Sequence, residues 1–420
     1  MTILAAVVSL LTFVQPQPTA SDSLTLQSCY NLARQRYPIA KKIELEQKIT
    51  DLNTSIANTR YFPQLKINGQ ASYQSEVTSF AMQGPTLSKD QYKVGVDVSQ
   101  SIFSGGAIGI RKRLEQSKGE QAVDVVRVDL HKIREQVNQV FFSILLSQKQ
   151  SETVQLLTDN LQKQLNTVRS RVKNGTLLPS QQHILEAELI KARQDSADIR
   201  SNIRAGYEVL GELIDQKIPS GTELALPETV ASVEGEAGLH RPEYKLFESS
   251  KNILEVQKKL IQSEKYPTLA AFGSVNYGRP GYNFLKDDFH DFYMVGLKLS
   301  WDFWDWSNAS EKVKALTIQQ QTVDQNQAAF SKQVQASVYR IREQITSLQE
   351  KMWRDREIID LRRQVVNESA SQLRNGVITA TEYVTVLTNA NQARLALEIH
   401  KVQLRQAQID LATTLGLTIE

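Results

Sequence analysis

The sequence has few of the residues that build covalent frameworks or metal sites. Cys29 is the only cysteine, which excludes an intrachain disulfide and a zinc site built from cysteines. The five histidines, at positions 131, 183, 240, 290 and 400, show no spacing typical of metal ligands. The chain also lacks a P-loop, a G-x-G-x-x-G motif and a Ser/His/Asp constellation. We therefore expect no cofactor and no enzymatic activity.

An excess of one charge and a long apolar run are missing as well. The 49 basic and 46 acidic residues are scattered, so the net charge of +3 gives no footprint for nucleic acid. The apolar stretch 3–14 is too short to span a bilayer, and small residues follow it near Ala20. This pattern predicts a signal peptide at residues 1–20, although a basic start is missing and a buried N-terminal helix is the alternative. Cys29 stands fifteen residues after the stretch, which argues against a lipid anchor.

Proline is absent from residues 107 to 173, where a long helix is expected. Apolar residues recur there in steps of three and four, as Val123, Val126, Leu130, Ile133, Val137, Val140 and Ile144, then as Leu161, Leu165, Val168 and Val172. A second series is Val334, Val338, Ile341, Ile345, Leu348 and Met352. This spacing is typical of coiled coils. A helix of 67 residues is about 100 Å long, more than a globular core can use.

The sequence contains an internal duplication. Residues 61–74 (YFPQLKINGQASYQ) align with residues 265–278 (KYPTLAAFGSVNYG) at an offset of 204, and YKVGVDVS aligns with YMVGLKLS at an offset of 201. Asn174-Gly175 and Asn375-Gly376 are also 201 residues apart. A nearly constant offset indicates two copies of one structural unit. Each Asn-Gly pair ends a long helical stretch, and its glycine is expected to supply a left-handed C-terminal cap.

Each copy carries two segments in which apolar and polar residues alternate. The apolar series are Tyr92, Val94, Val96 and Val98 in one segment, and Tyr293, Val295, Leu297, Leu299, Trp301 and Phe303 in another. Segments of this kind match the roughly 9–11 residues of a tilted membrane strand. Two ordinary soluble hairpins, each with one face on a core, are the alternative.

Aromatic residues favour the membrane interpretation. Three of the four tryptophans lie in residues 301–306 (WDFWDW), where a strand is expected to end and a helix to begin. The opposite end of that hairpin holds Tyr282, Phe284, Phe289, Phe292 and Tyr293. Two aromatic clusters at the two ends of an alternating strand resemble the girdles at the two interfaces of a membrane barrel.

The expected layout is mixed α and β, mainly α, with two repeats. The first repeat, 21–215, has helix 24–60, strands 62–74 and 91–103, long helix 107–173 and helix 179–215. A linker or equatorial region covers 216–241. The second repeat, 242–420, has helix 242–264, strands 266–278 and 291–304, long helix 308–374 and helix 379–415.

Four strands per chain cannot close a barrel, and open strand edges are not tolerated in lipid. Three chains would supply twelve strands, whereas two would supply eight, whose lumen is filled by side chains. An open lumen therefore favours three chains. The long helices leave the strands at one end, where they can continue the wall as a tube of coiled-coil pairs.

The order of these motifs resembles the TolC family of outer-membrane efflux proteins, over essentially all of residues 23–416. LTLQSCYNLARQRYP (24–38) is similar to the opening helix of the family, and QSIFSGG (100–106) resembles its Phe-x-Gly-Gly strand-to-helix signature. NGTLLPSQ (174–181) and NGVITATE (375–382) resemble its tip motif, in which Ser or Thr and an acid follow the glycine.

The resemblance implies a homotrimer, with a twelve-stranded transmembrane β-barrel in the outer membrane of a Gram-negative bacterium and an α-helical coiled-coil barrel in the periplasm. It also implies two partners: a periplasmic adaptor (membrane fusion) protein at the helical tips and an inner-membrane transporter. The adaptor-contact candidates are Asn174, Gly175, Ser180, Gln181, Asn375, Gly376, Thr381 and Glu382. Gln181 stands where the family often has an acid, so the two tips are expected to differ in charge.

The resemblance further implies a constriction near the tips and a defined junction between strands and helices. The candidate constriction residues are Arg169, Arg171, Arg374 and Glu368, with Lys173 and Asp159 nearby. A solvated polar helix face is the alternative for each of them. The junction candidates are Phe103, Gly105, Gly106, Trp304 and Trp306, and the second junction departs from the family by reading FWDWSN in place of Gly-Gly.

The leading hypothesis for function is passive export through a trimeric duct. A periplasmic coiled-coil scaffold or adaptor, with the hairpins as soluble tip domains, is the alternative. A substrate-specific porin is weaker, because porins lack helices of about 100 Å. Neither the cargo nor the class of pump is indicated by the sequence.

Overall fold

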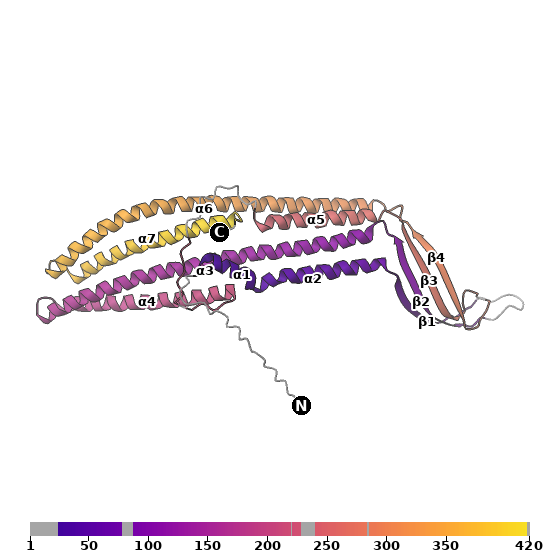
Figure 1. Cartoon of the computed structure of the whole chain (residues 1–420), viewed down its shortest axis with the longest axis horizontal. Coiled ribbons are helices and arrows are strands. Elements are labelled where there is room, and N and C mark those ends of the chain that lie inside the picture. Colours follow the sequence, from indigo (N-terminus) through magenta and orange to yellow (C-terminus); the bar gives the residue numbers. More distant parts are fainter. Residues whose placement is uncertain (1–23, 78–86, 220, 228–239, 284, 418–420) are drawn as a thin grey trace, which may run out of the picture.

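The computed structural model describes residues 24–77, 87–219, 221–227, 240–283 and 285–417. The expected signal peptide at 1–20 lies outside the described residues, as do Phe284 and part of the linker 216–241. The chain forms a long rod of helices with a tilted four-stranded sheet at one end (Figure 1).

The elements follow one another in two similar series. The first is α1 (Leu26–Arg36), α2 (Pro38–Asn58), the short 3-10 helix η1 (Thr59–Tyr61), β1 (Gln64–Tyr73), β2 (Asp90–Phe103), α3 (Ala107–Lys173) and α4 (Pro179–Ile214). The second is α5 (Pro242–Ser263), β3 (Thr268–Arg279), β4 (His290–Ser300), α6 (Asn308–Arg374) and α7 (Ala380–Thr414). Both α3 and α6 have 67 residues.

The single helix expected at 24–60 is wrong, because the structure has two helices that meet at Tyr37 and Pro38. Proline has no N–H to donate, and its ring disfavours helical geometry in the preceding residue. Tyr37 accordingly has an extended ψ of 131°. Its N–H still closes α1 by donating to the carbonyl oxygen of Ala33 at 3.1 Å.

The strand expected at 291–304 is too long. Its observed equivalent, β4, ends at Ser300, which pairs with Thr268, the first residue of β3. Residues beyond Ser300 have no ladder partner on β3 and turn toward α6. The first expected strand, 62–74, is shortened at its start to Gln64, because Pro63 cannot donate a ladder hydrogen bond.

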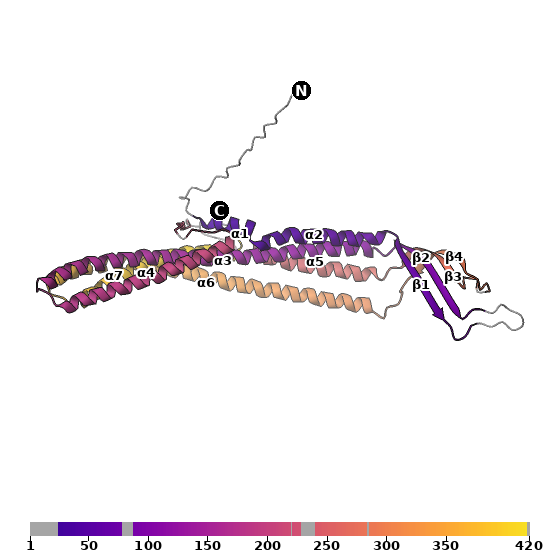
Figure 2. The same cartoon turned by 90° about the horizontal axis from the view of Figure 1, so that it is seen from below.

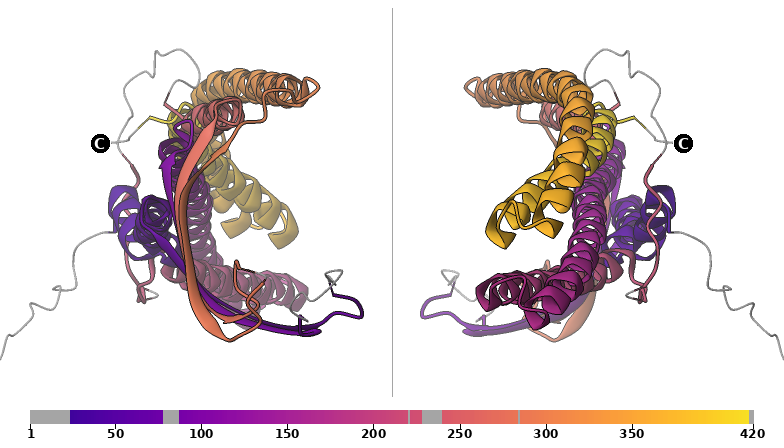
Figure 3. Two further views of the ribbon diagram at one scale, coloured as in Figure 1. Left: turned by 90° about the vertical axis from the view of Figure 1, so that its right-hand side faces the viewer. Right: turned by 90° about the vertical axis from the view of Figure 1, so that its left-hand side faces the viewer.

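Each long helix is flanked by two shorter helices placed end to end. α3 lies beside α4 over one half of its length and α2 over the other, and α6 lies beside α7 and α5 in the same way (Figures 1 and 2). α3 also contacts α5 and α7, which joins the two repeats side by side. Viewed along the rod, the chain makes an open arc rather than a closed tube (Figure 3).

The main core lies at mid-rod, where α1 and part of the linker pack against the long helices. It joins residues of α1, α3, α4 and α7 around Phe141, Phe142 and Tyr207. Leu24 and Leu224 form a bridge that ties the linker to the start of the first repeat. Cys29 is fully buried in this core, and burial raises the pKa of its thiol to about 12, so it acts as an apolar packing residue.

The four strands form one antiparallel sheet in the order β1-β2-β3-β4, and Figure 3 shows that it is curved. Alternation and register place the apolar series of all four strands on one surface, which we call the outward face. It comprises Leu65, Ile67, Gly69, Ala71, Tyr73, Tyr92, Val94, Val96, Val98, Leu269, Ala271, Gly273, Val275, Tyr277, Tyr293, Val295, Leu297 and Leu299. Its large side chains are mostly exposed in the single chain.

The opposite face of the sheet carries most of the polar residues. Asn68 donates a hydrogen bond to Asp97 there, across the β1–β2 pair. Phe292 also lies on this face, since it alternates with Tyr293 and pairs with Asn276. Its expected place in an outward aromatic girdle is therefore wrong, and its ring packs edge-on against Tyr282 at 4.8 Å between centroids.

Candidate functional site

The two helical tips are built by the same turn. In the first, the Thr176 N–H donates to the Arg171 carbonyl at 2.9 Å and the Gly175 N–H donates to the Val172 carbonyl at 3.0 Å. In the second, Val377 and Gly376 make the same two bonds to Gln372 and Leu373, at 2.9 and 3.1 Å. This is the Schellman motif, which requires a left-handed residue after the helix. Gly175 and Gly376 have φ of +70° and +72°, which confirms the expected caps.

The helices that follow the two turns begin differently. Thr379 and Glu382 form a capping box, in which the Glu382 N–H donates to Thr379 Oγ1 at 3.2 Å and the Thr379 N–H donates to Glu382 Oε2 at 2.7 Å. The pKa of the Glu382 carboxyl is lowered by the bond from the Thr379 N–H and by a second bond that the Thr379 hydroxyl donates to Oε2 at 3.0 Å. At the first tip Leu178 occupies the cap position without a side-chain bond, and Pro179 starts the helix. Gln181 Oε1 is buried there and has no partner among the described residues.

One hydrophobic cluster supports both tips. It consists of Leu161, Leu165, Val168, Leu185, Leu189, Ala192, Leu373, Ala380, Tyr383 and Leu387, drawn from α3, α4, α6 and α7. The turns stand on this cluster, and Asn174, Ser180, Asn375 and Thr381 are exposed around them. Leu178 and Val377 are 66% and 71% exposed. The predicted adaptor-contact residues therefore lie on two tips that share one rigid base.

The candidate constriction residues are not brought together in the single chain. Arg169 donates to Glu186 Oε1 on α4 at 2.6 Å, so it ties α3 to α4 within the first hairpin. The pKa of the exposed Glu186 carboxyl is lowered by the hydrogen bonds from Arg169 and Gln182. Sequence reasoning missed Glu186, because its contact with Arg169 spans 17 residues across a turn.

The other candidates point to no partner within this chain. Arg171, Lys173, Arg374 and Glu368 make no side-chain hydrogen bond or ion pair with the described residues, and Asp159 only accepts a bond from Gln155. Arg374, Lys173 and Glu368 are exposed. Their side chains remain available to another copy of the chain.

The junctions between strands and long helices have the same backbone but different residues. Gly105 and Gly106 have φ of +61° and +80°, and Trp306 and Ser307 have φ of +52° and +64°. Asp305 compensates in the second junction, since its carboxylate accepts from the Ser307 and Ala309 N–H groups at 3.0 Å each. Those bonds lower the pKa of Asp305, that from Ala309 contributing most.

An exposed aromatic band surrounds these junctions. Phe103, Trp301, Phe303, Trp304 and Trp306 all belong to it, and Trp306 is 85% exposed. Tyr61, Phe62 and Tyr266, which the sequence analysis did not assign to the junction, are exposed at the same end of the sheet. The segments that contain them, YFP (61–63) and KYP (265–267), had served in the sequence analysis only to align the two repeats. Both repeats therefore contribute aromatic residues to this band.

A buried polar network crosses the mid-rod core. The Tyr30 hydroxyl donates to Asn138 Oδ1, and Asn138 Nδ2 donates to Thr413 Oγ1 at 3.1 Å. Burial raises the pKa of the nearby Asp410 carboxyl to about 6, with a smaller contribution from Glu135. Burial also lowers the pKa of His131 to about 4. The network ties α1, α3 and α7 together at the point where the repeats meet.

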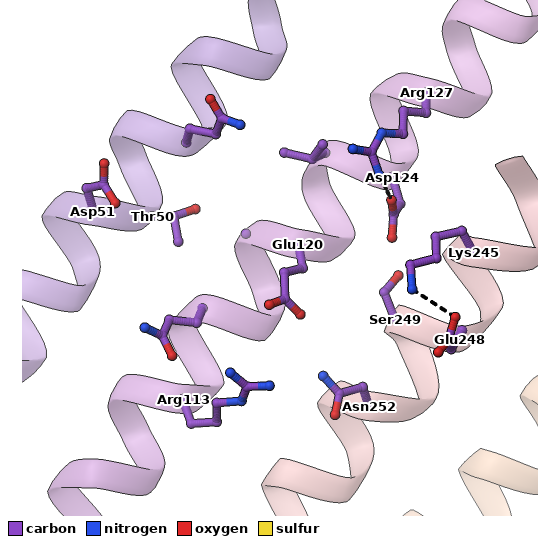
Figure 4. Close-up of a pocket in the computed structure, with 14 residues that line it drawn as sticks. Thr50, Asp51, Arg113, Glu120, Asp124, Arg127, Lys245, Glu248, Ser249 and Asn252 are labelled. Carbon is purple, nitrogen blue, oxygen red and sulfur yellow. Dashed lines mark hydrogen bonds and ion pairs between the residues drawn. The ribbon is translucent and has the colours of Figure 1, made fainter.

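A groove of about 790 Å³ lies between α2, α3 and α5 (Figure 4). Two charged pairs in its lining lie within single helices: Arg127 pairs with Asp124 at 2.7 Å, and Lys245 pairs with Glu248 at 2.9 Å. Asp51, Arg113 and Glu120 line the groove without an ion pair to the described residues. Asn252 donates to Ser117 at 3.0 Å. The lining is polar and charged, and no three potential metal ligands come together among the described residues, so we interpret the groove as a polar surface of the helical wall.

Two searches of the described residues bear on the class of protein. None of the helices formed by these residues is both long and apolar enough to cross a membrane. Within the same residues, no three His, Cys, Asp or Glu side chains gather in a way that could hold a metal ion.

Three solved structures share this fold. The outer membrane protein VceC from Vibrio cholerae has a TM-score of 0.72 at 14% identity, with 94% of this chain and 97% of that chain covered. The CmeC outer membrane channel of Campylobacter jejuni has a TM-score of 0.69 at 12% identity, with 99% and 93% covered. The open state of the MtrE outer membrane channel of Neisseria gonorrhoeae has a TM-score of 0.68 at 15% identity, with 93% and 89% covered. At these identities the likeness shows the fold.

The family comparison covers both repeats. The model of the family described as outer membrane efflux protein matches residues 29–214 and 254–417. No curated protein matches the sequence. Because the two matched segments coincide with the two structural series and span most of the chain, the protein belongs to the outer membrane efflux protein family, whose members are channel proteins and not enzymes.

Proposed function

We propose that three copies of this chain form a duct that exports solutes across the outer membrane, together with a periplasmic adaptor and an inner-membrane pump. The observation that carries the proposal is the sheet. Its outward face is apolar and exposed over all four strands, and it sits at one end of a helical rod. Such a face is stable only against lipid or another apolar surface.

The edges of the sheet support assembly from several copies. In the part of the chain that the structure describes, β1 and β4 each pair with one neighbour only, so each presents an unpaired ladder along the sheet edge. Unpaired backbone groups are not tolerated in hydrocarbon. Pairing β1 of one copy with β4 of the next satisfies both edges, and a ring of three copies contains twelve strands, enough for an open lumen.

The helices support the same ring. α2 has an exposed apolar stripe of Leu45, Ile49, Leu52 and Ile56, spaced as one face of a helix. α6 exposes Tyr339, Trp353, Ile358, Leu361 and Val365. α2 and α6 lie at opposite sides of the helical layer, with the α2 stripe in the sheet half of the rod and these α6 residues in the tip half, beside α7. Contact between copies would therefore bury each stripe against a different helix of the neighbouring copy.

In the proposed mechanism the duct conducts solutes passively, and the inner-membrane pump supplies the energy. The opposite face of the sheet, with Asn68, Asp97 and Lys66, would line the lumen with hydrated side chains. The tips would meet the adaptor through their exposed turns, and Arg171, Arg374 and Glu368 would lie near the periplasmic mouth. Removing those charges should change conductance, and unchanged conductance in an Arg171→Gln/Arg374→Gln double variant would exclude them from the constriction.

The first test is location and conductance. We expect the mature protein in the outer-membrane fraction, resistant to alkaline extraction, and we expect the purified detergent-solubilised assembly to form discrete channels in planar bilayers. Recovery as a soluble monomer or dimer in the periplasmic fraction, without channel activity, would support the scaffold alternative.

The second test addresses the tips. Gly175→Glu or Gly376→Glu should abolish export of the pump's substrates while leaving membrane insertion intact. Leu178→Asp and Val377→Asp probe the same surface without disturbing the glycine turns, and should weaken export as well. Leu285→Asp introduces the same charge at an exposed residue of the far end and serves as the control. Normal export by all four tip variants would reject docking at the tips.

A further inference from the structure

A shallow groove of about 470 Å³ lies on the outward face of the sheet, near the end that is remote from the helices. It is lined by Gly69, Gln70, Ala71, Tyr92, Lys93, Val94, Tyr277 and Phe289. The outward side chains elsewhere on β1 are larger, namely Leu65, Ile67 and Tyr73. The groove therefore exists because β1 has two small residues in succession on this face.

The floor and wall of the groove are both apolar. A Cβ added to Gly69 would meet no atom of the described residues within 4 Å, so these residues leave the space above Gly69 open. The wall is an aromatic stack in which the Phe289 ring lies 6.1 Å from that of Tyr92 and 6.0 Å from that of Tyr277, at interplanar angles of 27° and 23°. Stacked rings of this kind give a rigid surface suited to a hydrocarbon chain.

Arg279 stands at the outer end of the aromatic wall. Its register partner on β2 is Tyr92, and its guanidinium lies 5.2 Å from the ring centre of Phe289 and 6.0 Å from that of Tyr92. Its Nε is buried without an acceptor, and no carboxylate of the described residues lies within ion-pair distance of the guanidinium. The two terminal nitrogens of the guanidinium are not buried in this way and have no acceptor among the described residues, so they are the donors that an external acceptor could reach.

We propose that this groove binds a phosphate-bearing lipid of the outer leaflet, with an acyl chain between β1 and the aromatic wall and the phosphate on Arg279. The inference rests on the proposed function, which puts the outward face in the membrane and this end of the sheet at the outer interface. Arginine binds phosphate through paired N–H groups, and stacking on Tyr92 and Phe289 holds it in place. In the proposed ring β4 of the neighbouring copy lies beside β1 and would bound the groove on that side.

The lipid, rather than a soluble anion, is favoured by the composition of the site. A free phosphate would find one guanidinium beside a groove whose two polar lining residues, Gln70 and Lys93, belong by alternation to the opposite face. A lipid would fill the groove and give Arg279 an acceptor at once. A phosphate-free lipid would fill the groove but leave Arg279 without its acceptor. The two halves of the site can therefore be tested separately.

The test is native mass spectrometry of the detergent-solubilised full-length assembly, titrated with three probes. Dioleoyl phosphatidic acid has both chemical parts, dioleoylglycerol lacks the phosphate, and inorganic phosphate lacks the chains. We expect phosphatidic acid to bind best, and Arg279→Gln to weaken its binding about tenfold through loss of charge-assisted hydrogen bonds. Gly69→Leu, which fills the groove, should weaken phosphatidic acid and dioleoylglycerol alike.

Two control variants match these changes. Lys66→Gln removes a positive charge from the opposite face of the sheet, and Gly273→Leu adds the same side chain elsewhere on the outward face, where its Cβ would make an ordinary 3.5 Å contact with Val295. Neither should alter lipid binding. Equal affinity of the Arg279→Gln variant, equally tight binding of inorganic phosphate, or equal losses in the controls would each overturn the proposal.

The outcome is separable from that of the proposed function. Membrane insertion and channel formation are measured first on the same preparation. An inserted, conducting assembly that shows no preference for phosphatidic acid would reject the lipid site alone. A soluble, non-conducting protein would reject the duct, and the lipid site with it.

Discussion

The two repeats use different residues to build the same backbone, and the strand–helix junctions show this most clearly. Ser104, Gly105 and Gly106 occupy the positions of Asp305, Trp306 and Ser307, 201 residues later. The middle and last residues of both triplets are left-handed. The first repeat reaches this conformation with glycines, and the second supports it with the two hydrogen bonds accepted by Asp305. Turn geometry is thus retained while the stabilising chemistry has changed.

The tips differ in the same manner. The two tips have equivalent Schellman hydrogen bonds. The second tip, however, has a capping box at the positions where the first has Leu178 and Pro179. Beneath the turns, the ion pair of Arg169 and Glu186 corresponds by position to Ala370 and Leu387, which belong to the apolar cluster. The first hairpin is therefore held partly by surface charge and the second by burial. Exchanging residues between the repeats should reveal which difference matters.

The largest effect is expected from exchanging the pair beneath the tips. Leu387→Glu places the first repeat's carboxylate at a site that is 3% exposed, and should destabilise the fold by about 4 kcal/mol or more. The reciprocal change, Glu186→Leu, removes only an exposed ion pair worth about 0–1 kcal/mol. Thermal unfolding followed by circular dichroism at 222 nm measures both. Similar losses from the two variants would contradict the distinction between the hairpins.

A smaller but specific loss is expected at the first junction. In Gly105→Ala the new Cβ would lie 2.7 Å from the Ser263 carbonyl oxygen, so strain and overpacking should together cost about 2–4 kcal/mol. Gly106→Ala has equally positive φ but open space around its Cβ, and should cost only about 1–2 kcal/mol. The unfolding temperatures of the two variants test this order. Equal losses would show that packing against α5 is unimportant.

The mid-rod core offers a pH-dependent comparison, because Asp410 corresponds by position to Val209 of the first repeat. The folded-state pKa of Asp410 is raised to about 6 by burial. The folded protein therefore holds this proton between about pH 4 and 6, where the unfolded chain has lost it, and stability falls as pH rises through that window. Asp410→Asn should raise the unfolding temperature at pH 7.5 by a few degrees.

The advantage of Asp410→Asn should disappear near pH 4, where the native aspartate is also protonated. The pKa of His131 is lowered from its ordinary value near 6.5 to about 4, so its contribution makes the fold less stable as pH falls below 6.5. This contribution opposes the trend set by Asp410. The difference between the wild-type protein and Asp410→Asn cancels the histidine contribution. A difference that is constant from pH 4 to 8 would rule out titration of Asp410 as the cause.

The smallest effect is expected at the helix caps. Thr379→Ala removes the capping box and should cost about 1 kcal/mol. Transferring the box to the first tip, with Leu178→Thr and Gln181→Glu together, should stabilise that helix by about 0.5–1 kcal/mol. Denaturant midpoints at constant slope provide the measurement. If the transfer destabilises the protein, the exposed Leu178 has a packing role that the single chain does not show.

The features that could be predicted from the sequence are those that rest on a pattern of residues recurring at a regular spacing. Steps of three and four residues predicted the long helices, alternation predicted the strands, and the 201-residue offset predicted two equivalent tips. Each of these signals is repeated many times along the chain, so a local exception does not hide it. The break at Tyr37 and Pro38 was not predicted, because the helical pattern continues on both sides of this single proline.

The parts of the site that escaped prediction depend on single contacts between distant residues. Glu186 reaches Arg169 across a turn, and Asn138 reaches Thr413 over 275 positions. Asp305 supports a left-handed turn without glycine through hydrogen bonds that no sequence motif indicates. The groove beside Arg279 depends on the size of Gly69 and Ala71 and on a stack between strands. Such features need the register of the sheet before they can be recognised.

We expect two further copies of the chain to complete the outward face and the two open sheet edges in the outer membrane. Native mass spectrometry of the protein extracted in mild detergent from purified outer membranes tests this most directly, since it counts the chains. We predict a single dominant species of three chains that dissociates only under strong activation. A dominant monomer, dimer or tetramer in that extract would contradict the claim.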